Sequence, residues 1–379
     1  MHRIYLDCNA TTPMDPDVLE AMIPYLSGLC ANPSSIHTPG QEARNAVEKA
    51  RIQVAAALHA DPTEIFFTSG GTEANNMAIK GALGAGRAGG SHIVTTAIEH
   101  SSVLETLHHL EASGVEISEV PVDRHGRVSP DRVLQALRED TRLVTIGHAN
   151  NEIGTVQPID EIAGLLAERS VLFHTDAVQS LGKLALDVSR LGVDMASLSG
   201  HKCYGPKGVG VLFIRKGSRI DPLLHGGPQE QKLRAGTENV PFIVGMSRVA
   251  EVASLRLEED RKHYLGLRNR LEEEIEKRID GIQFHGHPEH RLPQTSNVSI
   301  DGIDALTFQI RLDLVGFAVS TGSACSSGSS ELSHVHAALG LDEGTSAIRV
   351  SLGRMTTEED CLSFVTAMEE IVKDLRRYV

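Results

Sequence analysis

Hydrophobic side chains follow a helical period first and then a series of short apolar runs. In residues 41–58 they recur on one helix face, at Ala43, Val47, Ala50, Val54 and Leu58. Longer helical or mixed stretches then separate short apolar runs at residues 92–96, 143–147, 171–174 and 209–214. Runs this short and this apolar are typical of a parallel sheet that is covered on both faces. The pattern therefore predicts an α/β domain over residues 15–255.

A second, smaller domain is predicted after this alternation ends. Residues 251–278 form a long charged helical stretch, which we interpret as the bridge between two domains. Beyond it, short strands at 296–300 and 347–350 lie among helical segments, which indicates an α+β domain.

Charge and composition exclude several classes of partner. The net charge of −14 over 379 residues argues against nucleic acid or an anionic membrane surface. Aromatic residues make up 4% of the chain and Trp is absent, so a base-stacking platform is not expected. No apolar run reaches the length of a membrane span, and Asp7 comes too early for a signal peptide.

The five cysteines are scattered and form no CxxC pair, which argues against a disulfide framework or a zinc knuckle. This usage indicates a reducing, cytoplasmic compartment. Four of the five are interpreted as small buried hydrophobic residues: Cys8, Cys30, Cys203 and Cys361.

Chemically capable side chains follow four of the predicted strands. In open α/β sheets ligands bind beyond the carboxyl ends of the strands, so these residues are expected to meet at one edge of the sheet. In chain order they are Glu99, His100, Ser101, Asn150, Asn151, Glu152, Asp176, Gln179, Ser199, His201 and Lys202.

Lys202 is the strongest candidate for a nucleophile. It follows a short polar segment, residues 199–201, and precedes a glycine-rich segment, residues 205–210; an apolar strand is predicted directly before them. A lysine that forms a Schiff base must be partly desolvated, and the flanking Ser199 and His201 can hold an anion beside it. The alternative is a strand followed by a surface turn, where lysine is common.

Two further features fit a pyridoxal phosphate site. Residues 66–74 read as a strand, a glycine turn and a helix start, where backbone N–H groups and the Thr72 hydroxyl can hold a phosphate. Asp176 precedes Lys202 by one strand–helix–strand step, and such a carboxylate can keep a pyridine nitrogen protonated. Taken alone, the first feature is also compatible with an ordinary glycine turn, and Asp176 with a helix N-cap.

With these features in this order, the chain resembles the pyridoxal phosphate enzymes of fold type I, the aspartate aminotransferase fold. More closely, it resembles the class V cysteine desulfurases of the NifS/IscS type. The resemblance extends from end to end. Besides the motifs above, it is carried by Asn32-Pro33-Ser34-Ser35, Gly236-Thr237-Glu238-Asn239, Ser323-Ala324-Cys325 and Ile348-Arg349-Val350-Ser351.

The resemblance implies a large domain with a mainly parallel, seven-stranded type of sheet. It also implies a small domain of residues 1–14 and 256–379 that carries a cysteine loop at about 320–332. Lys202 would bind pyridoxal phosphate covalently, and Thr237 would reach the phosphate from the other subunit of a homodimer. The other implied cofactor-binding residues are Gly71, Thr72, Asn151, Asp176, Gln179, Ser199 and His201.

The resemblance also assigns the residues of the reaction. His100 would stack on the cofactor ring and relay protons, and Arg349 together with Asn151 would bind the substrate. An arginine fork suits a carboxylate better than a lysine does. The implied reaction converts L-cysteine to L-alanine.

Cys325 lies in a small, polar stretch that packing alone does not favour, so a thiol there can swing between a buried site and solvent. The implied role of Cys325 is to take the sulfur as a persulfide. It would then pass the sulfur to an acceptor, typically an iron–sulfur scaffold, and touch the nascent cluster as an iron ligand.

Three alternatives remain open from the sequence. A selenocysteine lyase would act on a substrate that shares the carboxylate, the amine and a chalcogen. A class V aminotransferase for small amino acids would not need Cys325. A sulfur-relay protein without turnover is disfavoured because Lys202, Asp176, His100 and Cys325 are all present.

Overall fold

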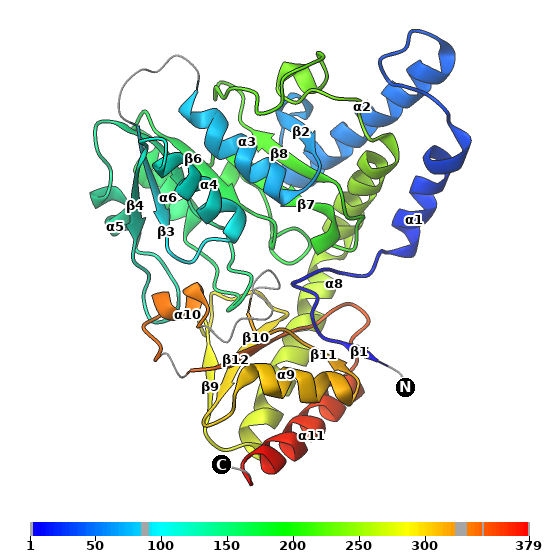
Figure 1. Cartoon of the computed structure of the whole chain (residues 1–379). Coiled ribbons are helices and arrows are strands. Elements are labelled where there is room, and N and C mark those ends of the chain that lie inside the picture. The colour runs from blue at the N-terminus through cyan, green and yellow to red at the C-terminus, as the bar shows by residue number, and fades with distance from the viewer. Residues whose placement is uncertain (1–2, 85–90, 323–331, 343–344, 378–379) are drawn as a thin grey trace.

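The computed structural model describes residues 3–84, 91–322, 332–342 and 345–377. Within these ranges a seven-stranded sheet forms the centre of the molecule, in the order β2-β8-β7-β6-β5-β3-β4 (Figure 1). Its strands are β2 (Ile65–Thr68), β3 (His92–Thr96), β4 (Glu116–Val120), β5 (Thr141–Thr145), β6 (Leu172–Asp176), β7 (Met195–Ser199) and β8 (Gly210–Ile214). The sheet is mainly parallel, as the resemblance implied.

One expectation about this sheet is wrong. The run at residues 209–214 was expected in a parallel sheet, but β8 runs antiparallel to both β7 and β2. The connection from Ser199 to Gly210 is too short for a parallel crossover, which needs about a dozen residues or more. It turns back instead through a short 3-10 helix, Gly200–Lys202.

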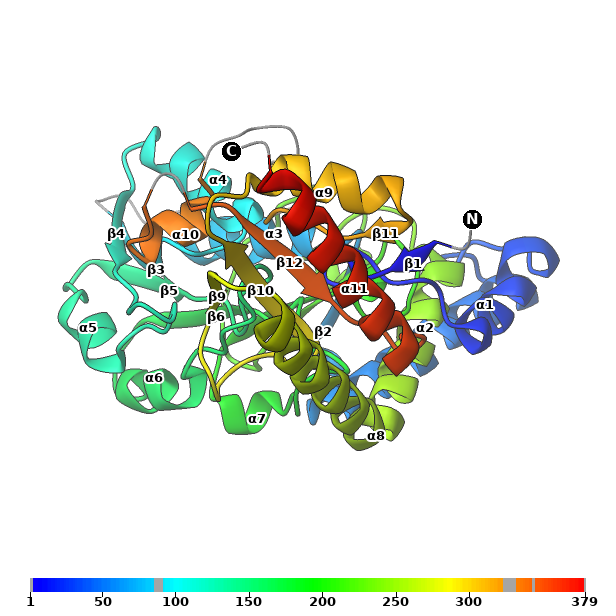
Figure 2. The same ribbon diagram turned by 90° about the horizontal axis from the view of Figure 1, so that it is seen from below.

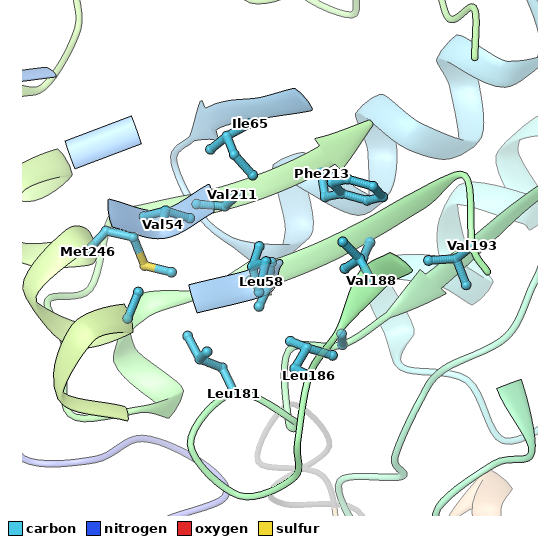
Figure 3. Packing of buried hydrophobic residues seen from close by; sticks show 14 of the residues in the cluster. Val54, Leu58, Ile65, Leu181, Leu186, Val188, Val193, Val211, Phe213 and Met246 are labelled. Carbon is cyan, nitrogen blue, oxygen red and sulfur yellow. The ribbon is translucent and has the colours of Figure 1, made fainter. Parts of the chain in front are cut away.

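Helices cover both faces of the sheet. The buried cluster on one face includes residues of α2 (Thr38–Leu58), α5 (Pro130–Gln135), α6 (Ile159–Leu166), α7 (Val188–Leu191) and the start of α8 (Val240–Arg278), and α1 (Pro16–Ile23) packs on α8 at its margin. The other face packs against α3 (Gly71–Leu83) and α4 (Ser101–Glu111). Neighbouring residues of a strand point to opposite faces, so Leu143 joins one buried cluster and Val144 the other. Figure 3 shows part of the larger cluster, where Val54 and Leu58 of α2 lie near Val211 and Phe213 of β8.

The C-terminal part has its own sheets and its own buried cluster. An antiparallel sheet has the order β12-β10-β9, and β1 pairs with β11 in parallel. The remaining elements are β1 (Ile4–Tyr5), β9 (Ile282–His285), β10 (Thr295–Ile300), α9 (Ala305–Leu314), β11 (Phe317–Ala318), α10 (His334–Ala338), β12 (Ala347–Ser351) and α11 (Glu358–Leu375). Seen from below, α8 and α11 lie across this sheet (Figure 2).

Helix α8 connects the two parts. Its first turns pack in the cluster of the central sheet, and its last turns, from Leu267 to Ile275, pack in the C-terminal cluster. The helix begins at Val240 rather than at residue 251. The charged pattern that predicts a helix marks only its exposed part, whereas the first turns are apolar and buried. The two clusters support the predicted division at residues 14 and 255, which stays a prediction. Across the described residues, no helix combines the length and the hydropathy needed to cross a membrane.

Candidate active site

A cavity of about 270 Å³ lies beyond the carboxyl ends of β3, β5, β6 and β7. Asn9 and Ala10 from the N-terminal segment and Arg349 from β12 complete its wall. The structure thus brings together residues from segments that are far apart in the sequence. The predicted site residues that line the cavity are Gly71, Thr72, His100, Asn151, Asp176, Gln179, Ser199, His201, Lys202 and Arg349.

Lys202 ends the short helix after β7, and its amine points to the N-terminal segment. Its Nζ donates hydrogen bonds to the carbonyl oxygens of Asn9 at 2.7 Å and Ala10 at 2.9 Å. Burial, together with the positive charges of Lys183 and Arg349, lowers the pKa of Lys202 to about 8. About a tenth of the amine is therefore neutral at pH 7, far more than for an unperturbed lysine, and the neutral form is the one that attacks a carbonyl carbon.

The glycine-rich segment after Lys202 packs closely against helix α8. A Cβ atom at Gly205 would lie 2.5 Å from Cγ2 of Val249 in α8 and 2.8 Å from the carbonyl oxygen of Gly200. The turn that carries Lys202 can approach α8 only because this position has no side chain.

Asp176 ends β6, and its carboxylate is held by two donors. Oδ2 accepts a hydrogen bond from Nδ2 of Asn75 at 2.7 Å, and Oδ1 accepts one from the backbone N–H of Val178 at 3.0 Å. The same Nδ2 lies 2.8 Å from the hydroxyl of Ser102. These contacts orient the carboxylate in the cavity, and sequence analysis had not singled out Asn75 for this task.

His100 caps the first turn of α4. The backbone N–H of Ser102 donates to Nδ1 of His100 at 3.1 Å, so the neutral ring carries its proton on Nε2. Burial lowers the pKa of His100, which favours the neutral ring. A neutral imidazole with Nε2–H can donate a proton at that atom and take one back.

Part of the cavity wall can receive an anion. Here α3 begins at Gly71, where a Cβ atom would lie 2.7 Å from Cγ2 of Val178. The hydroxyl groups of Thr72 and Ser199 have no hydrogen-bond partner among the described residues and are free to donate. Burial lowers the pKa of His201 to about 4, so its ring is neutral. A helix N-terminus with these donors fits a phosphate group.

Arg349 is the charged group that the C-terminal sheet brings to the cavity, and it is 1% exposed. Nη2 donates to Oδ1 of Asp7 at 2.7 Å, and Nη1 donates to the carbonyl oxygen of Asn151 at 3.0 Å. Nε is buried and has no partner among the described residues. The guanidinium is therefore held rigidly while it keeps donor capacity for a carboxylate.

Glu99 is a further polar group of this wall. Its Oε1 accepts from the Thr96 hydroxyl at 2.6 Å, and its Oε2 accepts from the backbone N–H of Gly147 at 2.8 Å. Burial raises the pKa of Glu99 to about 8. The sequence indicated Glu99 because it follows a predicted strand, but its position in the sequence predicted no role for it.

Two predicted residues are not brought to this cavity. Thr237 is exposed and does not line it, and Cys325 lies outside the described residues. The expectation for the other cysteines holds for Cys8, Cys203 and Cys361, which are buried, but it is wrong for Cys30. Cys30 is exposed because it follows the π-helical turn Pro24–Gly28, none of whose residues is buried.

The residues present fit pyridoxal phosphate. A buried amine of lowered pKa, an oriented carboxylate and an anion-binding helix N-terminus line one cavity, and these are the three groups the cofactor requires. When bound there, the cofactor supplies an electron sink for bonds broken at the carbon that carries the substrate amine.

Comparisons with known proteins agree with this site. The family model described as aminotransferase class-V matches residues 4–364. The cysteine desulfurase IscS of Dictyoglomus turgidum is 48% identical over 376 residues, which cover 99% of this chain and 95% of that protein. The cysteine desulfurase IscS of Methanosarcina thermophila is 48% identical over 98% of this chain and 93% of that protein.

Solved structures give the same result. A NifS-like protein superposes with a TM-score of 0.92 at 42% identity, over 98% of this chain and 99% of that chain. SspA in complex with cysteine superposes with a TM-score of 0.80 at 39% identity, over 92% of this chain and 98% of that chain. The chain therefore belongs to the class V aminotransferase family, within the group of the NifS/IscS-type cysteine desulfurases, whose cofactor is pyridoxal phosphate.

Proposed function

We propose that this protein is a pyridoxal phosphate-dependent cysteine desulfurase. It converts L-cysteine to L-alanine and transfers the sulfur to Cys325. The observation that carries this proposal is the single cavity that joins the Lys202 amine, the Asp176 carboxylate and the Arg349 guanidinium. An amino acid needs all three groups: one to exchange with its amine, one to support the cofactor ring and one to bind its carboxylate.

Each residue has a defined task in this reaction. Arg349 and Asn151 bind the substrate and fix the orientation of its carboxylate. Lys202 would hold the cofactor, and its Nζ can take and return protons in the cavity. His100 moves a proton at Nε2 on the face where its ring lines the cavity.

Sulfur transfer requires a thiolate as the nucleophile. The Cys325 thiolate attacks the substrate sulfur, a sulfur–sulfur bond forms, and the carbon–sulfur bond of the substrate breaks. The electron pair of that bond stays with the substrate carbon, which is protonated to the methyl group of alanine. L-cysteine and the Cys325 thiol thus become L-alanine and a Cys325 persulfide, and no external oxidant is needed.

The test is incubation of the cofactor-loaded protein with L-cysteine, with alanine measured by chromatography and the persulfide measured on Cys325 by mass spectrometry. We expect both products, and we expect Cys325→Ser to form neither while it still binds the cofactor. Alanine release by Cys325→Ser would contradict the proposal and indicate a lyase that does not use this thiol. Amino-group transfer to a keto acid without alanine would indicate an aminotransferase.

The partners are part of the proposal. The protein acts as a homodimer in which Thr237 of one subunit binds the cofactor phosphate of the other. The exposed position of Thr237, away from the cavity of its own chain, supports this arrangement. The persulfide of Cys325 is delivered to a sulfur acceptor such as an iron–sulfur scaffold in the cytoplasm, where Cys325 touches the nascent cluster.

A further inference from the structure

Lys183 is a buried cation that the reaction described above does not use. It is 4% exposed, does not line the cavity, and forms no ion pair with a carboxylate of the described residues. An ammonium group without a counter-ion is costly to bury, and deletion of such a charge often leaves a protein as stable or makes it more stable. A buried ammonium group unpaired with any described carboxylate therefore points to a task other than stability.

The only hydrogen-bond partner of the Lys183 amine in the described part of the chain leads to the active site. Nζ of Lys183 donates to Oε1 of Gln179 at 2.9 Å. Nε2 of Gln179 donates to the carbonyl oxygen of Asn9 at 3.0 Å. The same carbonyl oxygen accepts from Nζ of Lys202 at 2.7 Å. A continuous chain of hydrogen bonds thus joins the two lysines through Gln179 and Asn9.

This chain fixes which way the Gln179 amide faces. A lysine ammonium can only donate, and a backbone carbonyl can only accept. Oε1 of Gln179 must therefore face Lys183, and Nε2 must face Asn9. One N–H of Nε2 is used by Asn9, and Gln179 lines the cavity, so the second N–H is available to an acceptor atom there.

The charge of Lys183 also acts on Lys202. The groups that face Lys202 are Lys183 before α7, Arg349 of β12, Asp7 of the N-terminal segment, Asp176 of β6 and His100 of α4. Lys183 itself is faced by Arg349, by the buried thiols of Cys8 and Cys203, and by His201. Burial lowers the pKa of Lys183 to about 8, so the group is mostly charged at neutral pH.

We propose that Lys183 is a positioning residue that fixes Gln179 as a donor toward the cofactor and disfavours a second positive charge on Lys202. The proposal rests on the proposed function only in taking Lys202 as the residue that holds the cofactor. Lys183 does not line the cavity, and it acts through Gln179 and through its charge.

The test is a pH titration of the visible absorbance of the cofactor-loaded enzyme, which reports protonation at the nitrogen of Lys202. Lys183→Met removes the charge and keeps the length of the side chain. We expect its titration midpoint to rise by about one pH unit, because removal of a nearby positive charge favours the protonated form at Lys202. We also expect a several-fold weaker cofactor affinity, because Oε1 of Gln179 loses its partner.

Three controls separate this role from a structural one. Lys216→Met removes an exposed lysine and is expected to leave the midpoint unchanged. Lys183→Arg keeps the charge and is expected to bring the midpoint back toward wild type. Lys183→Met is expected to unfold at no lower temperature than wild type. Should Lys183→Met not fold, Lys183→Gln removes the charge, retains an N–H donor and makes the same test.

An unchanged midpoint in a folded, cofactor-loaded Lys183→Met or Lys183→Gln protein would overturn the inference. So would an equal rise in Lys183→Arg. Neither result depends on turnover, since the titration needs no substrate. If wild type forms alanine and persulfide but the midpoint does not move, only this inference fails. If wild type shows no turnover, the proposed function fails and the titration still reports on Lys183.

Discussion

At the residue scale, the reactivity of the candidate site depends on burial. Lys202 and His100 both have lowered pKa values, and burial is the largest cause for each. The cavity wall removes water from both groups and disfavours their charged forms. The result is an imidazole that favours its neutral form and an amine whose pKa lies closer to neutral pH than that of an unperturbed lysine.

The pKa of Lys202 predicts how fast cofactor-free protein captures pyridoxal phosphate at different pH values. The neutral amine is the reactive form, and a pKa of about 8 means that it is fully formed by about pH 9. We expect the capture rate to rise with pH up to that point and then to level off, as measured by stopped-flow absorbance. A rate that still rises about sevenfold between pH 9 and 10 would indicate an unperturbed lysine, whose pKa is about 10.4.

Arg349→Lys tests whether the Arg349 guanidinium binds the substrate carboxylate. The substitution keeps a positive charge but loses the planar fork that also holds Asp7 and Asn151. We expect the KM for L-cysteine to rise about 10- to 100-fold, since a hydrogen bond to a charged group contributes roughly 1.5–3 kcal/mol. Steady-state alanine formation measures this, with the visible spectrum of the bound cofactor as a check that the cavity is intact. An unchanged KM would remove Arg349 from substrate binding.

At the scale of elements, a buried ion pair holds the segment that leads to Thr237. Nη2 of Arg51 in α2 donates to Oε1 of Glu230 at 2.8 Å, and Oε2 of Glu230 accepts from the backbone N–H of Phe67 in β2 at 2.8 Å. Glu230, Gln231 and Lys232 have φ values of 43°, 54° and 70°. Three consecutive residues in this unfavourable region need a firm anchor, and the Arg51–Glu230 pair supplies it.

Glu230→Ala is expected to lower the free energy of unfolding by about 3 kcal/mol, because it removes the buried carboxylate partner of Arg51 and leaves only the exposed Glu48 to pair with that charge. Guanidinium denaturation measures this effect. The double variant Arg51→Met/Glu230→Leu removes both charges and is the matched control, with a smaller expected loss. If the single and the double variant lose the same stability, the pair is not the anchor described here.

At the scale of the whole molecule, the cavity exists only because two parts of the chain meet. Arg354, which follows β12, joins them: Nε donates to Oδ2 of Asp260 in α8 at 2.6 Å, and Nη1 donates to Asp15 at 3.1 Å. Its guanidinium also lies over the ring of Tyr204, in the turn after Lys202, at 4.2 Å. These contacts tie the C-terminal sheet to the segment that carries the predicted nucleophile.

The homodimer proposal predicts complementation between subunits. Thr237→Val is expected to weaken cofactor affinity by about tenfold or more, through the loss of one charged hydrogen bond. Mixing it with Lys202→Ala forms heterodimers in which one site combines an intact Lys202 with an intact Thr237. We expect this site to recover wild-type cofactor affinity, measured by fluorescence titration. Absence of recovery in verified heterodimers would mean that Thr237 does not act across the interface.

The sequence by itself determined the strands of the central sheet other than β4, their order along the chain and most of the site. Apolar runs mark these strands because they are buried on both faces, whereas β4 at the edge of the sheet is half-exposed and has no such run. Parallel strands must deliver the residues at their carboxyl ends to one edge of the sheet. That rule alone placed His100, Asn151, Asp176 and Lys202 together.

The tertiary structure decided what depends on contacts between distant segments. No local pattern shows that Asn9 receives the Lys202 amine, that Arg349 is fixed by Asp7, or that Lys183 reaches the site through Gln179. The strand β8 runs antiparallel because it pairs with both β7 and β2 after a short turn. The pKa of Lys202 is lowered because the folded chain removes water around the amine. These features arise from burial and from long-range hydrogen bonds, which exist only once the chain has folded.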